Sequence, residues 1–215
     1  MKPYYEQSGI TIYHGDCCEV VDSFGLHWGE KPFDLLLTDP PYGIGKDGQA
    51  QSTGNHGGRK AYEFLDWDSE PPSMDLLMAL CGLARVQIIW GGNYFGLPPK
   101  QKWLVWDKGQ RINQSDGELA WTSMDGALRI FTLNRAELMR DGAVHPTQKP
   151  EVLMRWCMDQ AGDPASVFDP FMGSGSTLVA AKRLGKSAVG IEREERYCEI
   201  AVRRLQQEVL PLEVA

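Results

Sequence analysis

Short apolar runs alternate with amphipathic runs along this chain, and the two kinds of run predict strands and helices. The run from Phe33 to Thr38 is apolar on both faces, which is typical of a strand in the middle of a parallel sheet. A helix is predicted over 73–84, where Ser73 is a good N-cap and helical periodicity follows it. Further strands are predicted at 10–13, 86–90, 102–106, 119–122, 127–133, 166–169 and 188–191, and further helices at 150–161, 176–184 and 194–207. This alternation predicts an α/β fold, a doubly wound parallel sheet with an antiparallel end, in a single domain over 1–215.

Composition narrows the class of protein. The 215 residues are 42% hydrophobic and 24% charged, which suits one globular domain with a sizeable core. No apolar run approaches the roughly 20 residues of a membrane span, and the first residues lack the layout of a signal peptide. The five cysteines include no C-x-x-C pair, which argues against a disulfide framework and against a zinc module. We therefore expect a cytoplasmic protein with no membrane partner and no metal ion.

The predicted central strand ends abruptly in a group of residues that suggests a site. Asp39, Pro40, Pro41 and Tyr42 follow it directly. A carboxylate and an aromatic ring are thereby placed on a backbone that two prolines make rigid. A strand end stiffened by proline and capped by aspartate is the structural alternative, and it stays open on this stretch alone.

A second site is predicted where a strand joins a helix through the sequence FDPFMGSGST, residues 168–177. Its glycines allow a tight bend and close approach of a ligand to the helix N-terminus. No lysine follows the loop, so it is not a phosphate-binding P-loop. The third glycine of the dinucleotide fingerprint is replaced by Ser176 or Thr177, which argues against a dinucleotide oxidoreductase.

The strand after this loop ends in Glu192, which is placed to accept hydrogen bonds from two ribose hydroxyls. The implied ligand is an adenosine-like molecule with a small anionic group in place of a pyrophosphate, and S-adenosylmethionine fits that description. The alternative is a glycine turn beside a solvated glutamate.

Taken together, these motifs resemble the amino-methyltransferases that modify DNA bases. The DPPY sequence at 39–42 comes first and the glycine motif followed by GIE comes last, an order that resembles the permuted β class of that family. Other matching pieces are Gly15 with Asp16, HPTQKP at 145–150 and ERYCEIAVRRL at 195–205. The resemblance therefore spans nearly the whole chain.

The resemblance implies a fold and a set of cofactor-binding residues. The fold is the Rossmann-like, seven-stranded sheet of S-adenosylmethionine-dependent methyltransferases, circularly permuted, with a catalytic half over 33–133 and a cofactor half over 145–208. The strands before the two motifs are implied to lie side by side, so that their ends meet at a topological switch point. In the family, the acid after the glycine strand binds ribose, the aspartate of GD contacts adenine, and the loop and the KP pair line the methionine end. The matching residues are Asp16, Lys149, Pro150, Asp169, Pro170, Phe171, Gly173, Ser174, Gly175, Ser176, Thr177 and Glu192.

Methylation of an exocyclic amine explains the residues of DPPY. The amine is a poor nucleophile because its lone pair is delocalised into the ring. Asp39 and the Pro40 carbonyl can accept its two N–H bonds and localise that pair, while Pro40 and Pro41 fix the backbone that aims them. Tyr42 is expected to stack on the flipped base. No covalent cysteine is expected, because Pro41 is followed by tyrosine.

The predicted activity is methylation of adenine in DNA, and several alternatives stay open. The nearest is methylation of cytosine N4, since the same groups serve both amines. RNA or a protein glutamine is another class of substrate. A non-catalytic module that binds adenosyl compounds or DNA is the alternative outside the enzymes.

DNA contact is predicted in two stretches, although the net charge is −7. One is the loop at 43–66; the other is a basic stretch at 98–113, for which a solvated face is the alternative. Most of the four tryptophans Trp90, Trp103, Trp106 and Trp121 are expected in the core, with pocket aromatics as the alternative, and His145 is expected to have a structural role. Only 134–144 separates the last central strand from HPTQKP, so a homodimer is one way to complete DNA recognition. The resemblance implies a bacterial, archaeal or phage-encoded enzyme.

Overall fold

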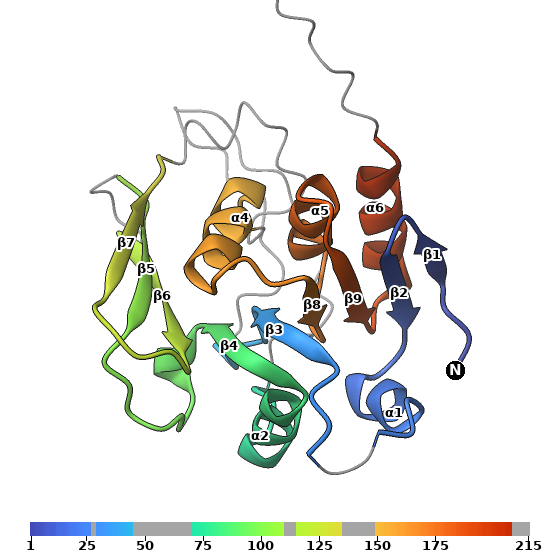
Figure 1. The fold of residues 1–215 in the computed structure, drawn as a ribbon, viewed down its shortest axis with the longest axis horizontal. Coiled ribbons are helices and arrows are strands. Elements are labelled where there is room, and N and C mark those ends of the chain that lie inside the picture. Colours follow the sequence, from blue (N-terminus) through green and yellow to red (C-terminus); the bar gives the residue numbers. More distant parts are fainter. Residues whose placement is uncertain (27–28, 45–69, 110–114, 135–148, 208–215) are drawn as a thin grey trace, which may run out of the picture.

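In the computed structural model, one mixed sheet runs through the part of the chain that the structure describes, residues 1–26, 29–44, 70–109, 115–134 and 149–207. Nine strands in these residues pair in the order β1-β2-β9-β8-β3-β4-β6-β5-β7 (Figure 1). They are β1 Tyr5–Gln7, β2 Ile10–His14, β3 Phe33–Thr38, β4 Ala84–Trp90, β5 Trp103–Asp107, β6 Gly117–Thr122, β7 Arg129–Thr132, β8 Ser166–Asp169 and β9 Ser187–Glu192. The number of strands is thus corrected from seven to nine.

Helices cover both faces of the sheet, as a doubly wound fold requires. Helices α4, α5 and α6 lie on one face, while α1 and α2 lie on the other (Figure 1). None of the helices in the described ranges is long and apolar enough to cross a bilayer. The helices are α1 Cys17–Asp22, α2 Met74–Gly82, α4 Glu151–Gln160, α5 Ser176–Arg183 and α6 Glu195–Gln206, with a 3-10 turn η1 at Gly92–Tyr94.

The mostly parallel sheet and its antiparallel end are confirmed. Strands β2, β9, β8, β3 and β4 pair in parallel. Strand β6 is antiparallel to both β4 and β5, and β7 returns parallel to β5. The edge strand β1, which the sequence pattern did not predict, forms a hairpin with β2 through Ser8 and Gly9. Both turn residues have positive φ (52° and 76°), as a tight two-residue hairpin turn requires.

Strand β3 is the buried centre that its apolar run predicts. Leu35, Leu36 and Leu37 are at most 1% exposed, although their side chains alternate between the two faces. On one face Phe33 stacks on Phe168 of the neighbouring strand, with ring centroids 4.6 Å apart. Packing on both faces therefore fixes the position of the strand, and with it the position of its carboxyl end.

The predicted neighbourhood of the two motif strands is also confirmed, because β3 lies directly beside β8. The carboxylate of Asp34 adds hydrogen bonds to the short pairing between β3 and β8. Asp34 accepts hydrogen bonds from the backbone N–H groups of Ala165 and Ser166, each at 3.1 Å, and from the Ser166 hydroxyl at the same distance. Burial raises the pKa of Asp34, but these hydrogen bonds outweigh it and lower the pKa below its usual range. Asp34 thus joins the two halves of the chain.

We predict that Asp34→Ala lowers the free energy of unfolding by about 1–3 kcal/mol, because the exposed Ala165 N–H and the partly buried Ser166 N–H and hydroxyl lose their acceptor. Urea denaturation of the whole chain measures the change. Glu6→Gln, on the exposed edge strand, is the control and should stay within about 0.5 kcal/mol. An Asp34→Ala protein as stable as this control would contradict the role of the carboxylate.

Candidate functional site

Four neighbouring parallel strands present an acidic residue at the same edge of the sheet. Asp16 follows β2, Glu192 ends β9, Asp169 ends β8 and Asp39 follows β3. Parallel strands align their carboxyl ends, so residues far apart in sequence converge there. The sequence-predicted site residues of both halves therefore share one edge.

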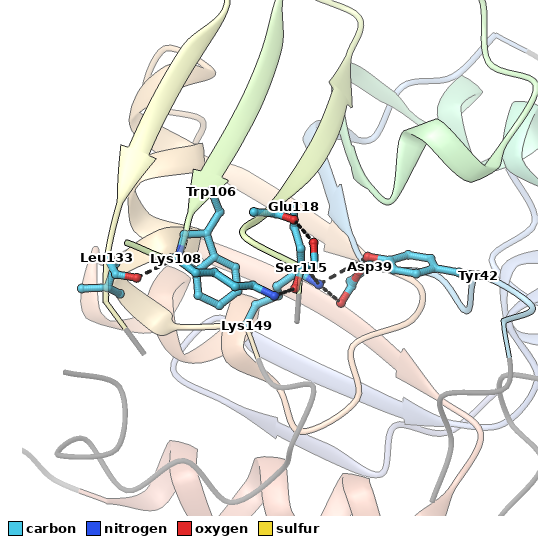
Figure 2. Close-up of polar contacts among 9 residues, drawn as sticks. Asp39, Tyr42, Trp106, Lys108, Ser115, Glu118, Leu133 and Lys149 are labelled. Carbon is cyan, nitrogen blue, oxygen red and sulfur yellow. Dashed lines mark hydrogen bonds and ion pairs between the residues drawn. The ribbon is translucent and has the colours of Figure 1, made fainter. Parts of the chain in front are cut away.

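The Asp39 carboxylate is the centre of a polar cluster at the end of β3. Its Oδ1 accepts the Tyr42 hydroxyl and its Oδ2 accepts the Lys149 ammonium group (Figure 2). The adjoining Pro40 is buried and Pro41 is half-buried, so the carboxylate stands on a rigid, packed turn. The side chain of Asp39 nevertheless remains 30% exposed and accessible to a substrate.

Lys149 links this carboxylate to a second one that sequence reasoning missed. The ammonium group lies 3.0 Å from Glu118 Oε2 on β6 and 3.4 Å from the Tyr42 hydroxyl. Its side chain is 7% exposed, and the Trp90 ring centroid lies 5.6 Å from Nζ. Lys149 was predicted to line the methionine end of the cofactor site, and that role stays a prediction. In the structure its ammonium group donates to the Asp39 carboxylate.

The charges of the cluster hold one another in place. Burial alone lowers the pKa of Lys149, but Asp39 and Glu118 raise it well above its usual value, so the group stays an ammonium. Burial likewise raises the pKa of Glu118, but Lys149 and Lys108 bring it down to about 2. For Asp39, burial raises the pKa and Lys149 offsets only part of that rise.

The Tyr42 ring is held in a fixed orientation beside Asp39. It stacks on Tyr94 with ring centroids 4.8 Å apart and planes 16° apart, and it meets the edge of Phe95. Its face also covers Gly91, where any Cβ atom would overlap the ring. Gly91 has φ of 69°, so both space and backbone conformation require glycine. The site thus contains an aromatic pair in which sequence reasoning had identified only Tyr42.

The glycine loop has one open position and one packed position. Gly173 has φ of 51°, and nothing lies within 4 Å of a Cβ atom added there. Gly175 has φ of 78°, and an added Cβ would lie 2.8 Å from Ala201 of α6. Helix α5 begins directly after Gly175, at Ser176, with Thr177 buried in its first turn. The loop therefore packs against α6 on one side and faces open space at Gly173.

Two buried carboxylates flank this loop. Asp169 is 3% exposed and accepts the Thr38 hydroxyl at 2.7 Å and the Phe171 N–H at 3.2 Å. Glu192 is half-buried and accepts the N–H groups of Gly173 at 3.0 Å and Glu194 at 2.8 Å. Burial raises the pKa of both carboxyl groups, and the hydrogen bonds offset only part of each rise. The resulting pKa is about 6 for Asp169 and about 7 for Glu192.

The loop also has a clamp that the sequence motif did not identify. Arg204 of α6 donates from Nη1 to the Ser174 carbonyl at 2.6 Å and lies 3.2 Å from the hydroxyls of Ser174 and Ser176. Burial lowers the pKa of Arg204. Its place in the matched ERYCEIAVRRL segment was the signal that could have found it.

Two prolines of the predicted cofactor site also lie in the described residues. Pro170 follows Asp169 directly and is buried, and Pro150 is the N-cap of α4.

Asp16 caps α1, where its carboxylate accepts the Cys18 N–H at 2.8 Å. The next-door Gly15 N–H donates to the Glu192 carbonyl at 3.0 Å, so Asp16 and Glu192 are at adjacent strand ends. Asp16, Cys17 and Cys18 place metal-ligand atoms within 4.8 Å of one another. However, burial raises the pKa of Cys17 to about 12, which disfavours the thiolate that a metal ligand needs.

The predicted DNA-contact stretches lie only partly in the described residues. Most of the loop at 43–66, the end of the basic stretch at 98–113, and 135–148 with His145 lie outside them. Within the described part, Lys100 pairs with the exposed Asp125 at 3.2 Å and Lys108 pairs with Glu118 at 2.6 Å. Burial is confirmed for three of the four tryptophans named in the prediction: Trp90, Trp106 and Trp121 are at most 6% exposed, and Trp103 is half-buried.

Comparison with known proteins finds relatives over nearly the whole chain. The DNA methylase family model, N6_N4_Mtase, matches residues 89–203, more than half of the chain. The type II methyltransferase M2.DpnII of Streptococcus pneumoniae is 48% identical over 259 residues, covering 96% of this chain and 93% of that protein. The type II methyltransferase M.ScaI of Streptomyces caespitosus is 25% identical over 276 residues, covering 98% and 86%.

Solved structures share the fold. The crystal structure of the M1.HpyAVI–SAM complex has a TM-score of 0.60 at 24% identity and covers 91% of this chain and 100% of that chain. The PvuII DNA methyltransferase, described as cytosine-N4-specific, has a TM-score of 0.61 at 16% identity and covers 97% and 90%.

We predict that the ligand-free chain loses stability as pH rises from 5 to 8. The folded-state pKa values of Asp169 and Glu192, about 6 and 7, lie above the ordinary values of 3.8 and 4.5. The folded state therefore binds these protons more tightly, and the resulting stability is fully present below about pH 4 and is lost as pH rises through 6 to 7. Glu192→Gln should remove about 1–3 kcal/mol of this pH dependence. Urea denaturation of both proteins between pH 5 and 8 tests it, and equal pH dependence would contradict it.

Proposed function

Because this chain belongs to the N6/N4 DNA methylase family, we propose that it transfers a methyl group from S-adenosylmethionine to the exocyclic amine of a flipped adenine in double-stranded DNA. One observation carries the proposal. Asp39, an acceptor for an amine, and the glycine loop, which is open at Gly173, lie at the carboxyl ends of the adjacent strands β3 and β8.

The residues of the cofactor half fit S-adenosylmethionine, whose bound sulfonium supplies an electrophilic methyl group. Gly173 leaves space where a side chain would project, and its N–H is already aligned on the Glu192 carboxylate. Glu192 retains lone pairs for two ribose hydroxyls, which would stabilise a carboxylate that burial disfavours. Asp16, at the adjacent strand end, is proposed to contact the adenine of the cofactor.

The catalytic half is proposed to hold the target amine. Asp39 and the Pro40 carbonyl accept its two N–H bonds, so the nitrogen lone pair points away from the ring plane. The nitrogen would take the methyl group as the bond between that group and the cofactor sulfur breaks to leave a neutral thioether, and the proton that the nitrogen loses would pass to Asp39 and then to water. Burial raises the pKa of Asp39, which suits that transient acceptance. Tyr42, already fixed by Tyr94, provides the face on which the base stacks.

DNA contacts are proposed for 43–66 and 98–113. Lys100 in the second stretch is available for such a contact. Its partner Asp125 is 96% exposed, and ion pairs on the surface are weak. The lysine can exchange that partner for a phosphate oxygen. A homodimer would add recognition surface to the short segment 134–144. Since two relatives are type II methyltransferases, the chain is proposed to be a bacterial or phage modification enzyme that acts in the cytoplasm.

Cytosine N4 is the second candidate position, since cytosine carries the same kind of amine and a structure of similar fold is described as cytosine-N4-specific. Aspartate as the first residue of DPPY favours adenine by family resemblance. Incubation of unmethylated DNA with labelled S-adenosylmethionine, digestion to nucleosides and mass analysis separate N6-methyladenine from N4-methylcytosine.

We predict that Asp39→Ala lowers methyl transfer to DNA by at least about 1,000-fold, because the amine loses its charged acceptor. Binding of S-adenosylmethionine, measured by calorimetry, should change by less than about threefold. Asp163→Asn, an exposed acid-to-amide change at a left-handed position that asparagine tolerates, is the control with wild-type rates. Methyl transfer by Asp39→Ala at the wild-type rate, or none by the wild type on any DNA, would overturn the proposed function.

We also predict that Glu192→Gln weakens binding of S-adenosylmethionine by about 10- to 100-fold, because charge-assisted hydrogen bonds to ribose are lost. Calorimetric titration at pH 8 measures the dissociation constant. Glu195→Gln, in the exposed first turn of α6, is the matched control and should bind as the wild type does. Equal affinities of the two variants would exclude Glu192 from ribose binding.

A further inference from the structure

Both oxygens of the Asp39 carboxylate are already hydrogen-bonded within the chain. Tyr42 donates to Oδ1 and Lys149 donates to Oδ2 (Figure 2). Each carboxylate oxygen has two lone pairs, but a target amine that donates to Asp39 competes with these donors for the same two oxygens. Asp39 is exposed enough, at 30%, for the exchange to take place at the site itself.

Lys149 is the donor with a second anion in reach. Its ammonium group lies 3.0 Å from Glu118 Oε2, and its side chain is only 7% exposed. A buried ammonium group that leaves one carboxylate without meeting another bears an uncompensated desolvation penalty. Glu118 removes that penalty, because Lys149 can leave Asp39 and remain paired.

Glu118 is itself held in place from the other side. It stands on β6, whose pairing with β5 sets Glu118 opposite Trp106. Lys108 lies 2.6 Å from Glu118 Oε1 and 5.1 Å from the Trp106 ring centroid. The two carboxylates and two ammonium groups of this cluster thus sum to zero net charge. The sum is the same whether Lys149 pairs with Asp39 or with Glu118.

Aromatic rings line the space in which the ammonium group would move. The Trp90 and Tyr42 ring centroids lie 5.6 and 5.8 Å from Lys149 Nζ, within cation–π range. These rings keep the cation in favourable surroundings during the exchange. Among the described residues, the groups within contact distance of the Lys149 ammonium group thus include two carboxylates, one phenol and one indole, and Glu118 and Trp90 have no role in the proposed chemistry so far.

We propose that Glu118 is a positioning residue that takes over the Lys149 ammonium group when the target amine replaces it on Asp39. The inference rests on the proposed function and deepens it, because it adds a residue to the site for the amine. Without Glu118, Lys149 stays on Asp39 and competes with the substrate as a charged donor. Glu118 thereby frees one acceptor oxygen for the amine.

A double-mutant cycle on methyl transfer tests this role. Glu118→Gln should lower kcat/KM for unmethylated DNA by about 10- to 100-fold, measured with labelled S-adenosylmethionine at saturation. Its calorimetric dissociation constant for S-adenosylmethionine should stay within threefold of the wild type. In the Lys149→Met background, where no cation competes for Asp39, Glu118→Gln should cost less than about threefold. Asp163→Asn is the matched acid-to-amide control with wild-type kinetics.

Each outcome of the cycle decides the inference. A 10-fold or larger loss in the wild-type background that disappears with Lys149→Met supports it. An equal loss in both backgrounds assigns Glu118 a structural role and overturns the inference, as does a Glu118→Gln protein with wild-type kcat/KM. A Lys149→Met protein without transfer also overturns it, because Lys149 would then be required rather than displaced. Active wild type with inactive Asp39→Ala keeps the proposed function in these cases, whereas a wild type without transfer ends both.

Discussion

The parallel pairing of β3 with β8 is the constraint on which the rest of the structure depends. Helix α2 follows β3 on one face of the sheet, while α5 follows β8 on the other (Figure 1). Their carboxyl ends therefore form the topological switch point where open α/β sheets bind ligands. The Thr38 hydroxyl and the Asp169 carboxylate join these ends at 2.7 Å across 131 positions of sequence. Because Thr38 directly precedes Asp39, this bond sets the position of residues 39–42 relative to the glycine loop.

The fold was predictable to the extent that local patterns determine it. The strand β3 was evident from an apolar run on both faces, and α2 began at Ser73, whose hydroxyl accepts the Leu76 N–H at 3.2 Å. The hairpin strand β1 was missed because its residues are polar and exposed, although the Ser8–Gly9 pair was a turn signal. Helix α1 was missed because six residues are too few to establish a helical repeat.

The sequence was enough to propose candidate residues for the site, but it did not identify the side chains that contact them. The acceptor Asp39 and the ribose-binding candidate Glu192 followed from motifs that are continuous in sequence. Glu118 carries no such motif, and its contact with Lys149 depends on the position of β6 beside β4 and on the position of Lys149 directly before Pro150, the N-cap of α4. The strand order that brings the two together is a property of the whole sheet, which no window of neighbouring residues determines.

The buried carboxylates at this edge of the sheet are compensated in two different ways. At Asp39 the chain supplies its own cations, and the cluster of four charges is neutral before any substrate arrives. At Asp169 and Glu192 the compensation comes from hydroxyl and backbone N–H groups, which leave both pKa values raised. That half therefore gains most from a ligand that brings hydroxyl donors and a positive charge, as a ribose-linked sulfonium does. The cluster at Asp39, in contrast, is proposed to accept a neutral amine in place of a cation that already has another partner. In the proposed function, binding of the cofactor is thus favoured by the uncompensated burial of two carboxylates, whereas binding of the base exchanges one donor for another and leaves the net charge of the cluster unchanged.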